Sequence, residues 1–191
     1  MNKTTRSISD KEYFDIINNI KEGFMHDGKK CRGNLKVAVA LQLEYNLGLR
    51  ISDVLSLKLN DIQWKDNQYR LDIVEQKTGK KRRFTVSAGI YEYIKDYCSK
   101  NKISADELII DITERQVQRI LKKVCDYLKL SDVSTHSFRK KSATDLYENN
   151  NHDIALVREF LQHSSIAITQ RYIACSRSKL NQALEQHQML Y

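Results

Sequence analysis

Proline is absent from all 191 residues of this chain, and apolar residues recur at helical spacing along most of its length. Proline breaks helices, so its absence suits a chain that is helical over long stretches. Between residues 61 and 87 the pattern changes, and apolar residues alternate with polar ones as in half-buried strands. The sequence therefore predicts a mainly α fold with a small antiparallel β-sheet, in the α+β class.

Helix signals mark most boundaries. Ser9 and Thr113 each open a capping box, with Glu12 and Gln116 three residues later. After an interval bracketed by Gly23 and Gly28, a second helix is expected over 32–46 and is ended by Gly48. Ser52 and Asp53 are expected to cap a short third helix. Further helices are expected from Ser87, from Thr113, over 136–147, from Asp153, from Ser164 to Tyr172 and over 179–189.

The alternating stretch predicts three strands. Ile62 and Trp64 mark the first, residues 69–73 the second and residues 83–87 the third, with a turn at 76–81. Five of the eight residues over 76–83 are basic, so this turn is either a solvated tip or a site that binds phosphate. Residues 101–112 have no clear pattern apart from a short extended piece at 108–110.

The net charge of +8 favours a polyanionic partner, because Lys and Arg release counterions when they bind nucleic acid. The sequence has no run of about 18 apolar residues and no apolar N-terminal segment, so neither a membrane span nor secretion is indicated. Its four cysteines are far apart and form no Cys-x-x-Cys pair, which argues against a zinc site or a disulfide framework. A cytoplasmic protein is expected.

Several residue types suit phosphate chemistry. His136 and Arg139 share one side of a helix start, where a guanidinium fork and backbone N–H groups can bind an anion. Tyr172 is a weak nucleophile at its ordinary pKa of about 10 and needs cationic donors or a base, which His163 and two arginines would supply. Taken alone, each of these residues has an ordinary structural explanation.

Two upstream segments add to this set. Arg50 follows Gly48 and precedes a short helix, and Asp53 could hold that Arg or a nearby His in place as well as cap the helix. Lys77 lies where a strand meets the turn and could give a proton to a leaving oxygen. Lys80 and Lys81 are rivals for that role.

The order of these segments resembles the catalytic set of the tyrosine recombinases, the phage-integrase family. Residues 47–57 (LGLRISDVLSL) look like its first-arginine box, and 76–79 (QKTG) are similar to its catalytic-lysine hairpin. Residues 135–139 (THSFR) match its His-x-x-Arg box, and 161–173 resemble its Leu-Gly-His…Tyr box. The resemblance covers about residues 9–172 and implies a tyrosine recombinase catalytic-domain fold.

The resemblance implies a DNA strand transferase that cuts and rejoins double-stranded DNA through a 3′-phosphotyrosyl intermediate, without a metal or cofactor. Arg50, Arg139 and His163 would hold the phosphate, and Tyr172 would attack it. Lys77 would protonate the departing 5′-oxygen, and His136 would accept the Tyr172 proton or donate to the phosphate. Asp53 would support them. The side chains expected on the DNA backbone are Lys80, Lys81, Arg82, Arg83 and Lys140.

The chain departs from the family pattern in two places, and the resemblance also implies a domain organisation and an oligomeric state. Gln162 replaces the usual Gly before His163, which puts the reach of His163 in question. Residues 1–191 are expected to form one catalytic domain, without the N-terminal clamp domain of the family, either as an excised domain or as a natural short recombinase. Residues 174–191 are expected to form a helical tail, which either docks on a neighbouring protomer or packs on its own domain. A homotetramer on DNA and a monomer or weak oligomer in its absence are implied, with no membrane association.

Three alternatives remain. Residues 113–141 can be a helix-turn-helix in a non-catalytic DNA-binding regulator, with Arg139, Lys140 and Lys141 on its second helix. The same fold could serve a type IB topoisomerase, although a Lys would be expected at the position of His136. A generic basic helical protein that binds acidic partners explains the charge alone.

Overall fold

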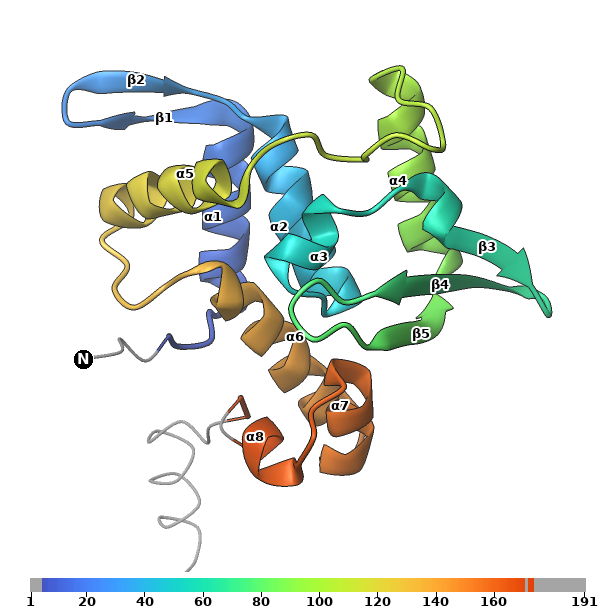
Figure 1. The fold of residues 1–191 in the computed structure, drawn as a ribbon. Helices are drawn as coiled ribbons and strands as arrows, with labels where there is room; N and C mark the ends of the chain where they lie inside the picture. The colour runs from blue at the N-terminus through green and yellow to red at the C-terminus, as the bar shows by residue number, and fades with distance from the viewer. Residues whose placement is uncertain (1–4, 171, 174–191) are drawn as a thin grey trace, which may run out of the picture.

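The structure of this chain, a computed structural model, describes residues 5–170 and 172–173. Helices make up most of it, and a small three-stranded antiparallel sheet lies at one side (Figure 1), which confirms the mainly α prediction. None of the helices in the described part is long and apolar enough to cross a membrane. In chain order the elements are α1 (Asp10–Glu22), β1 (Gly23–His26), β2 (Lys29–Arg32), α2 (Leu35–Leu47), α3 (Ile51–Leu55), the 3-10 turn η1 (Leu59–Asp61), β3 (Ile62–Lys65), β4 (Gln68–Val74), β5 (Lys81–Val86), α4 (Ala88–Lys100), α5 (Glu114–Tyr127), α6 (Thr135–Asn149), α7 (Ile154–Leu161) and α8 (Ile166–Gln170).

The centre of the fold is α2. Its residues 37–41 are five consecutive apolar residues, each at most 1% exposed, so this part of the helix is apolar all round and is covered on every side. The helices α1, α3, α5 and α6 pack against it. Figure 1 shows α2 running through the middle of this group. The large hydrophobic core is built around this helix.

A hairpin follows α1 where the sequence was expected to end one helix and begin another. Gly23 pairs with Arg32 and His26 with Lys29, and Asp27 and Gly28 form the turn with positive φ angles of 50° and 71°. Asp-Gly between two strands is a strong hairpin signal, so the prediction of a helix from residue 32 was wrong. The helix begins instead at Leu35, after the Asn34 cap.

The three-stranded sheet has the order β3-β4-β5, and both pairings are antiparallel. The third strand begins at Lys81, two residues earlier than expected. The β4–β5 turn is closed by backbone hydrogen bonds of 2.9 Å from Glu75 N to Lys80 O and from Gly79 N to Glu75 O. This turn carries Lys77. Farther along, Ile109 N donates to Leu57 O at 2.9 Å, which places the extended piece at 108–110 against the core.

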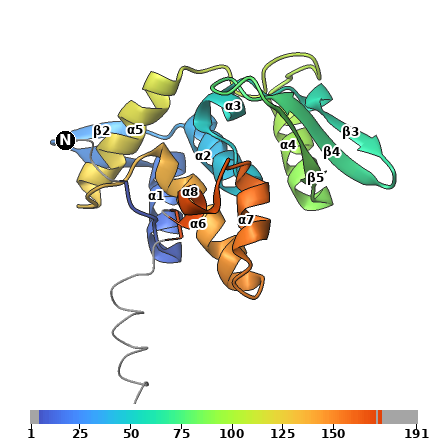
Figure 2. The same cartoon turned by 60° about the horizontal axis from the view of Figure 1, so that its bottom comes forward.

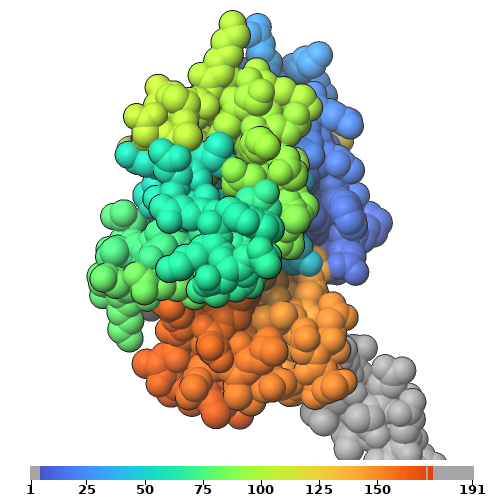
Figure 3. All heavy atoms as spheres, turned by 90° about the vertical axis from the view of Figure 1, so that its right-hand side faces the viewer, coloured from blue at the N-terminus to red at the C-terminus, as the bar shows by residue number. Residues whose placement is uncertain are grey.

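A second, much smaller hydrophobic cluster lies at the C-terminal end. Its buried members are Ala143, Val157 and Leu161, and α6 joins it to the large core because Phe138, near the start of α6, belongs to that core. In Figure 2 α6, α7 and α8 lie together, and Figure 3 shows α7 and the end of α6 below the sheet. We call α7, α8 and the C-terminal half of α6 the small lobe.

Candidate active site

The predicted site residues come from four places in the fold. Arg50 is the N-cap residue of α3, Lys77 lies in the β4–β5 turn, and His136 and Arg139 are in the first turns of α6. The fourth place is the small lobe, where His163 follows α7 and Tyr172 follows α8. The prediction that Ser52 and Asp53 cap α3 was wrong, since both lie inside it. The helix expected to reach Tyr172 ends at Gln170.

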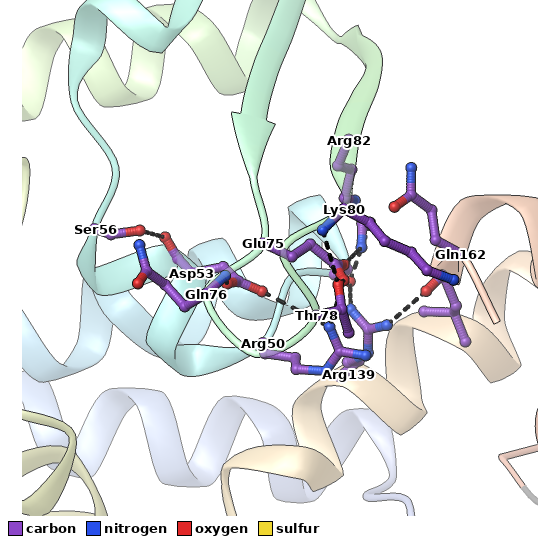
Figure 4. A network of polar contacts seen from close by, with 12 residues as sticks. Arg50, Asp53, Ser56, Glu75, Gln76, Thr78, Lys80, Arg82, Arg139 and Gln162 are labelled. Carbon is purple, nitrogen blue, oxygen red and sulfur yellow. Dashed lines mark hydrogen bonds and ion pairs between the residues drawn. The ribbon is translucent and has the colours of Figure 1, made fainter. Parts of the chain in front are cut away.

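Glu75 is the centre of the polar network shown in Figure 4, and the sequence analysis missed it. Its Oε2 accepts hydrogen bonds of 2.7 Å from Arg50 Nη1 and from Thr78 Oγ1, while Oε1 accepts one of 3.3 Å from Arg82 Nη1. Burial alone would raise the pKa of Glu75, but these three donors hold it below its ordinary value. Glu75 therefore stays ionised and ties the Lys77 turn to Arg50.

Asp53 supports the same turn from below. The side chain is 0% exposed, and its Oδ1 accepts a hydrogen bond of 2.7 Å from the backbone N–H of Gln76, the residue before Lys77. Its Oδ2 lies 4.0 Å from Arg50 Nη1. The expected support of Arg50 is thus a long ion pair, and the closer contact holds the backbone next to Lys77.

Arg82 was expected to contact the DNA backbone, but in this structure its side chain is buried and bound within the protein. The residue is 1% exposed, and besides Glu75 it donates to Leu47 O and Gly48 O at 3.2 Å and to Phe160 O at 2.7 Å. The last carbonyl groups of a helix lack partners within it and attract cations, so the end of α2 is a favourable place for this guanidinium. Burial, followed by the charge of Arg139, lowers the pKa of Arg82 to about 10.

The alternation of side chains along the strands could have revealed that Glu75 and Arg82 are buried and paired. Residues 71, 73 and 75 share one face of β4 and its extension, and residues 82, 84 and 86 share one face of β5. Leu71 and Val86 are buried on those faces, so Glu75 and Arg82 point inward with them. An acid and a base placed on the inner faces of neighbouring strands must be paired.

The other four basic residues expected on DNA are more accessible. Lys80, Lys81 and Arg83 are exposed, and Arg83 forms a surface ion pair with Asp72 at 2.6 Å. Lys140 is half-buried, its ammonium donates to Thr5 O, and it lies 5.6 Å from the centre of the Tyr172 ring.

Arg139 is fully buried in this structure. Its Nη1 donates to Gly48 O, and its Nη2 donates to Leu161 O at 2.8 Å. The guanidinium therefore spans the end of α2 and the end of α7. Burial, followed by the charge of Arg50, lowers its pKa.

His136 is a solvent-exposed member of this group of residues. Partial burial lowers the pKa of His136, and the positive charges of Arg139, Lys77 and Arg50 lower it further. His136 is thus within electrostatic reach of all three cations. His136 is therefore neutral near pH 7 and able to accept a proton.

His163 and Tyr172 meet in the small lobe. Their ring centres are 4.7 Å apart in an edge-to-face arrangement, and His163 Nδ1 is 3.1 Å from Thr169 Oγ1. Burial and then the charges of Arg139, Arg50 and Arg82 lower the pKa of His163 to about 4. Gln162, before it, has the left-handed conformation with φ 51° and ψ 40° that a Gly would adopt more easily. The residue still ends α7, and His163 reaches the cluster.

All six residues predicted as catalytic therefore surround one place between the large core and the small lobe. The described residues contain no group of three or more His, Cys, Asp or Glu side chains that could hold a metal ion. A cluster of guanidinium, ammonium and imidazole groups beside a phenol is suited to bind an anionic group and attack it.

Residues 6–179 match the model of the phage integrase family, and the chain belongs to that family. The probable integrase/recombinase YoeC of Bacillus subtilis is 35% identical over 67% of this chain and 71% of its own length. The tyrosine recombinase XerC of Listeria innocua is 28% identical over 80% of this chain and 54% of its own length. The chain thus spans about half the length of XerC.

Solved structures show the same fold. The XerH site-specific recombinase in a post-cleavage complex with palindromic difH substrate has a TM-score of 0.70 at 21% identity, covering 96% of this chain and 54% of that one. The catalytic domain of bacteriophage HP1 integrase has a TM-score of 0.64 at 15% identity, covering 96% and 95%. These likenesses confirm the predicted tyrosine recombinase catalytic-domain fold.

Proposed function

We propose that this chain is a site-specific DNA strand transferase that forms a covalent link between Tyr172 and a 3′-phosphate of double-stranded DNA. The observation that carries the proposal is the position of Tyr172, whose ring centre lies 4.7 Å from that of His163 and which is near enough to Arg139 to raise the pKa of that guanidinium. The phenol thus lies beside the cations that an attacked phosphate needs. The DNA substrate of XerH supports the same class of partner for this chain.

In the proposed reaction the Tyr172 oxygen attacks the phosphorus, and the bond from phosphorus to the 5′-oxygen breaks. His136, which is neutral, takes the phenol proton, and Lys77 gives a proton to the departing 5′-oxygen. A free 5′-hydroxyl from another strand then attacks the phosphotyrosine and reverses these transfers. The backbone is restored with its bond energy conserved, and no metal enters any step.

Charge stabilisation comes from the cations around the phosphate. The cluster contains four cationic side chains, Arg50, Lys77, Arg82 and Arg139. The ion pairs found there among the described side chains join Arg50 and Arg82 to Glu75 and, at 4.0 Å, Arg50 to Asp53. A surplus of fixed positive charge favours a transition state that gathers negative charge on the phosphoryl oxygens. We assign direct contact with the phosphate to Arg50, Arg139 and His163.

Because Arg139 is fully buried, DNA binding must expose it. Its Nη2 is covered where it donates to Leu161 O at the end of α7. A shift of the small lobe away from the large core would release that hydrogen bond and open the guanidinium to a phosphate. We therefore propose that DNA moves the small lobe. The predicted helical tail, 174–191, lies outside the described residues, and protomer docking and a homotetramer on DNA stay part of this proposal.

The non-catalytic regulator is less well supported. That alternative needs the basic residues of α6 in a DNA groove, but Arg139 is 0% and Lys141 4% exposed. Lys141 is instead bound to Asp10 and, at 2.9 Å, to Asp145.

The test uses a nicked duplex that carries the natural site and traps the covalent intermediate. We expect a protein–DNA adduct on a denaturing gel, formed equally well in EDTA, and its complete loss in Tyr172→Phe with DNA affinity retained. Tyr147→Phe, which changes another tyrosine of the small lobe, is the matched control and should still form the adduct. An adduct that persists in Tyr172→Phe, or DNA binding by the unchanged chain with no adduct, would contradict the proposal.

A further inference from the structure

A carboxyl group is buried beside the active site without a side-chain partner. Glu44, in α2, is 0% exposed, and neither of its oxygens makes a well-formed hydrogen bond among the described residues, although the backbone N–H of Ile51 is near enough to lower its pKa. Leaving a polar group unpaired in the interior costs folding free energy, and such groups mark places where a protein sacrifices stability for another purpose.

Glu44 lies next to the place where Arg139 is held. Gly48, whose carbonyl accepts from Arg139 Nη1, follows Glu44 by one helical turn, so both are on one face of α2. The helices α2 and α6 pack together. Burial raises the pKa of Glu44 well above its ordinary value, and the nearby charge of Arg139 opposes that rise. Glu44 is thus a buried acid close to a guanidinium.

Arg139 has a complementary unpaired group. Within the described part of the chain its two Nη atoms are bonded to Gly48 O and Leu161 O, while its buried Nε has no partner. A guanidinium carries five N–H donors in a rigid fork. When a phosphate takes the Nη edge, a fixed acceptor on Nε would set the plane of the fork.

We propose that Glu44 is a positioning residue for Arg139, accepting a hydrogen bond from its Nε when the Nη groups leave the two carbonyls and turn to the phosphate. The inference rests on the function proposed above. It explains why an unpaired acid lies one turn below a carbonyl group that Arg139 must leave. A displacement of about 1 Å in a reacting group can cost roughly 100-fold in rate, so the effect of losing this acceptor is measurable.

The decisive variant is Glu44→Leu, because a structural role and a positioning role of Glu44 predict different effects on the melting temperature and on the rate of adduct formation. Leucine removes an unpaired polar group from the interior, so the melting temperature should rise or stay the same. The single-turnover rate of adduct formation should fall by about 10- to 100-fold. Glu44→Gln keeps an acceptor oxygen and should recover most of that rate. The control is Glu92→Gln, an exposed carboxylate of α4, which should change neither quantity.

A double-mutant cycle with Arg139→Lys shows whether Glu44 acts through Arg139. Lysine has no Nε–H fork, so Glu44→Leu should cost little further rate in that background. The same cycle is also run on the affinity for the nicked duplex. A chain that binds DNA without forming an adduct would contradict the proposed strand transfer, but its affinities would still measure the coupling between Glu44 and Arg139. The two proposals can therefore fail independently. Glu44→Leu that forms the adduct at the unchanged rate, or effects that add in the rate and affinity cycles, would overturn the inference.

Discussion

The two sides of the active site are built differently. Arg50, His136 and Arg139 stand on elements of the large core, which includes residues from Ile8 to Phe138. His163 and Tyr172 stand on the small lobe, where only Ala143, Val157 and Leu161 form the buried cluster. Of the three residues proposed to contact the phosphate, Arg50 and Arg139 are therefore on the well-anchored side. The third, His163, and the proposed nucleophile Tyr172 are on the side with little apolar burial.

Hydrogen bonds to backbone carbonyls contribute to the junction between the two sides. Arg82 donates to Phe160 O at 2.7 Å, Arg139 to Leu161 O at 2.8 Å, and Gln162 Nε2 to Lys81 O at 3.4 Å. A guanidinium can exchange a carbonyl oxygen for a phosphate oxygen with little change in chemistry. Elements with few buried contacts also open at low free-energy cost. We therefore expect a rigid phosphate site and a movable nucleophile.

The largest effect is expected from breaking the junction at Arg82. Arg82→Ala leaves Glu75 with one cation fewer and the carbonyl oxygens of Leu47 and Phe160 without this donor, while Gly48 O keeps Arg139. Unfolding should therefore become easier by about 3–5 kcal/mol. Urea denaturation at neutral pH measures this change. Arg83→Ala, on the next residue, removes an exposed pair with Asp72 and should cost at most about 1 kcal/mol. Equal losses in the two variants would show that the junction does not depend on Arg82.

Two leucines test the anchoring of the two sides directly. Leu41 and Leu161 are both 0% exposed, one in the large core and one in the small lobe. Leu41→Ala should destabilise the whole domain by about 3–5 kcal/mol, and Leu161→Ala by about 2–3 kcal/mol, because the smaller lobe can collapse around the deletion.

Hydrogen exchange distinguishes local from global effects. Leu161→Ala should speed exchange over 154–170 while amides of α2 keep their protection, whereas Leu41→Ala should speed both. If Leu161→Ala raises exchange in α2 as much as in α7, the two sides unfold as one unit and the comparison fails.

Acid should loosen the small lobe first. The folded pKa of His163 is about 4, against about 6.5 for an unperturbed histidine, so the folded state favours the neutral ring. The stabilisation is fully present above pH 6.5 and is lost as the pH falls from 6.5 to 4, by at most about 3 kcal/mol.

Stability measured at pH 7 and pH 4.5 checks this. His163→Asn should flatten the dependence over this interval, and exposed His152→Asn, the control, should leave it as it was. An unchanged slope in His163→Asn would show that the ring is not protected from protonation in the folded state.

Much of the fold followed from local sequence signals. Ser9 and Thr113 open the helices that their capping boxes predicted, and the alternation over 61–87 forms the three-stranded sheet. The β1–β2 hairpin was missed because its strands are short and polar, so that Asp27 and Gly28 were the main signal for it. Short strands carry too few residues for their period to show.

The site was predictable in part for a different reason. The types and order of Arg50, Lys77, His136, Arg139, His163 and Tyr172 pointed to phosphate chemistry, and the fold brings them together. The ion pair between Glu75 and Arg82 was not predicted, because the two residues lie seven positions apart in a stretch whose composition is typical of a solvated turn. Only the tertiary structure places the ends of α2 and α7 beside Arg82 and buries it there.

The smallest expected effect is at Gln162, where the departure from the family pattern and the junction coincide. Its left-handed φ of 51° is unfavourable for a residue with a Cβ, and its buried Oε1 has no partner in the described structure. Gln162→Gly should therefore stabilise the end of α7 by about 0.5–1 kcal/mol, less the weak hydrogen bond to Lys81 O. Gln162→Ala keeps the Cβ and should gain nothing. If thermal unfolding shows equal gains for both variants, the backbone is not strained, and the benefit comes from removing the unpaired amide.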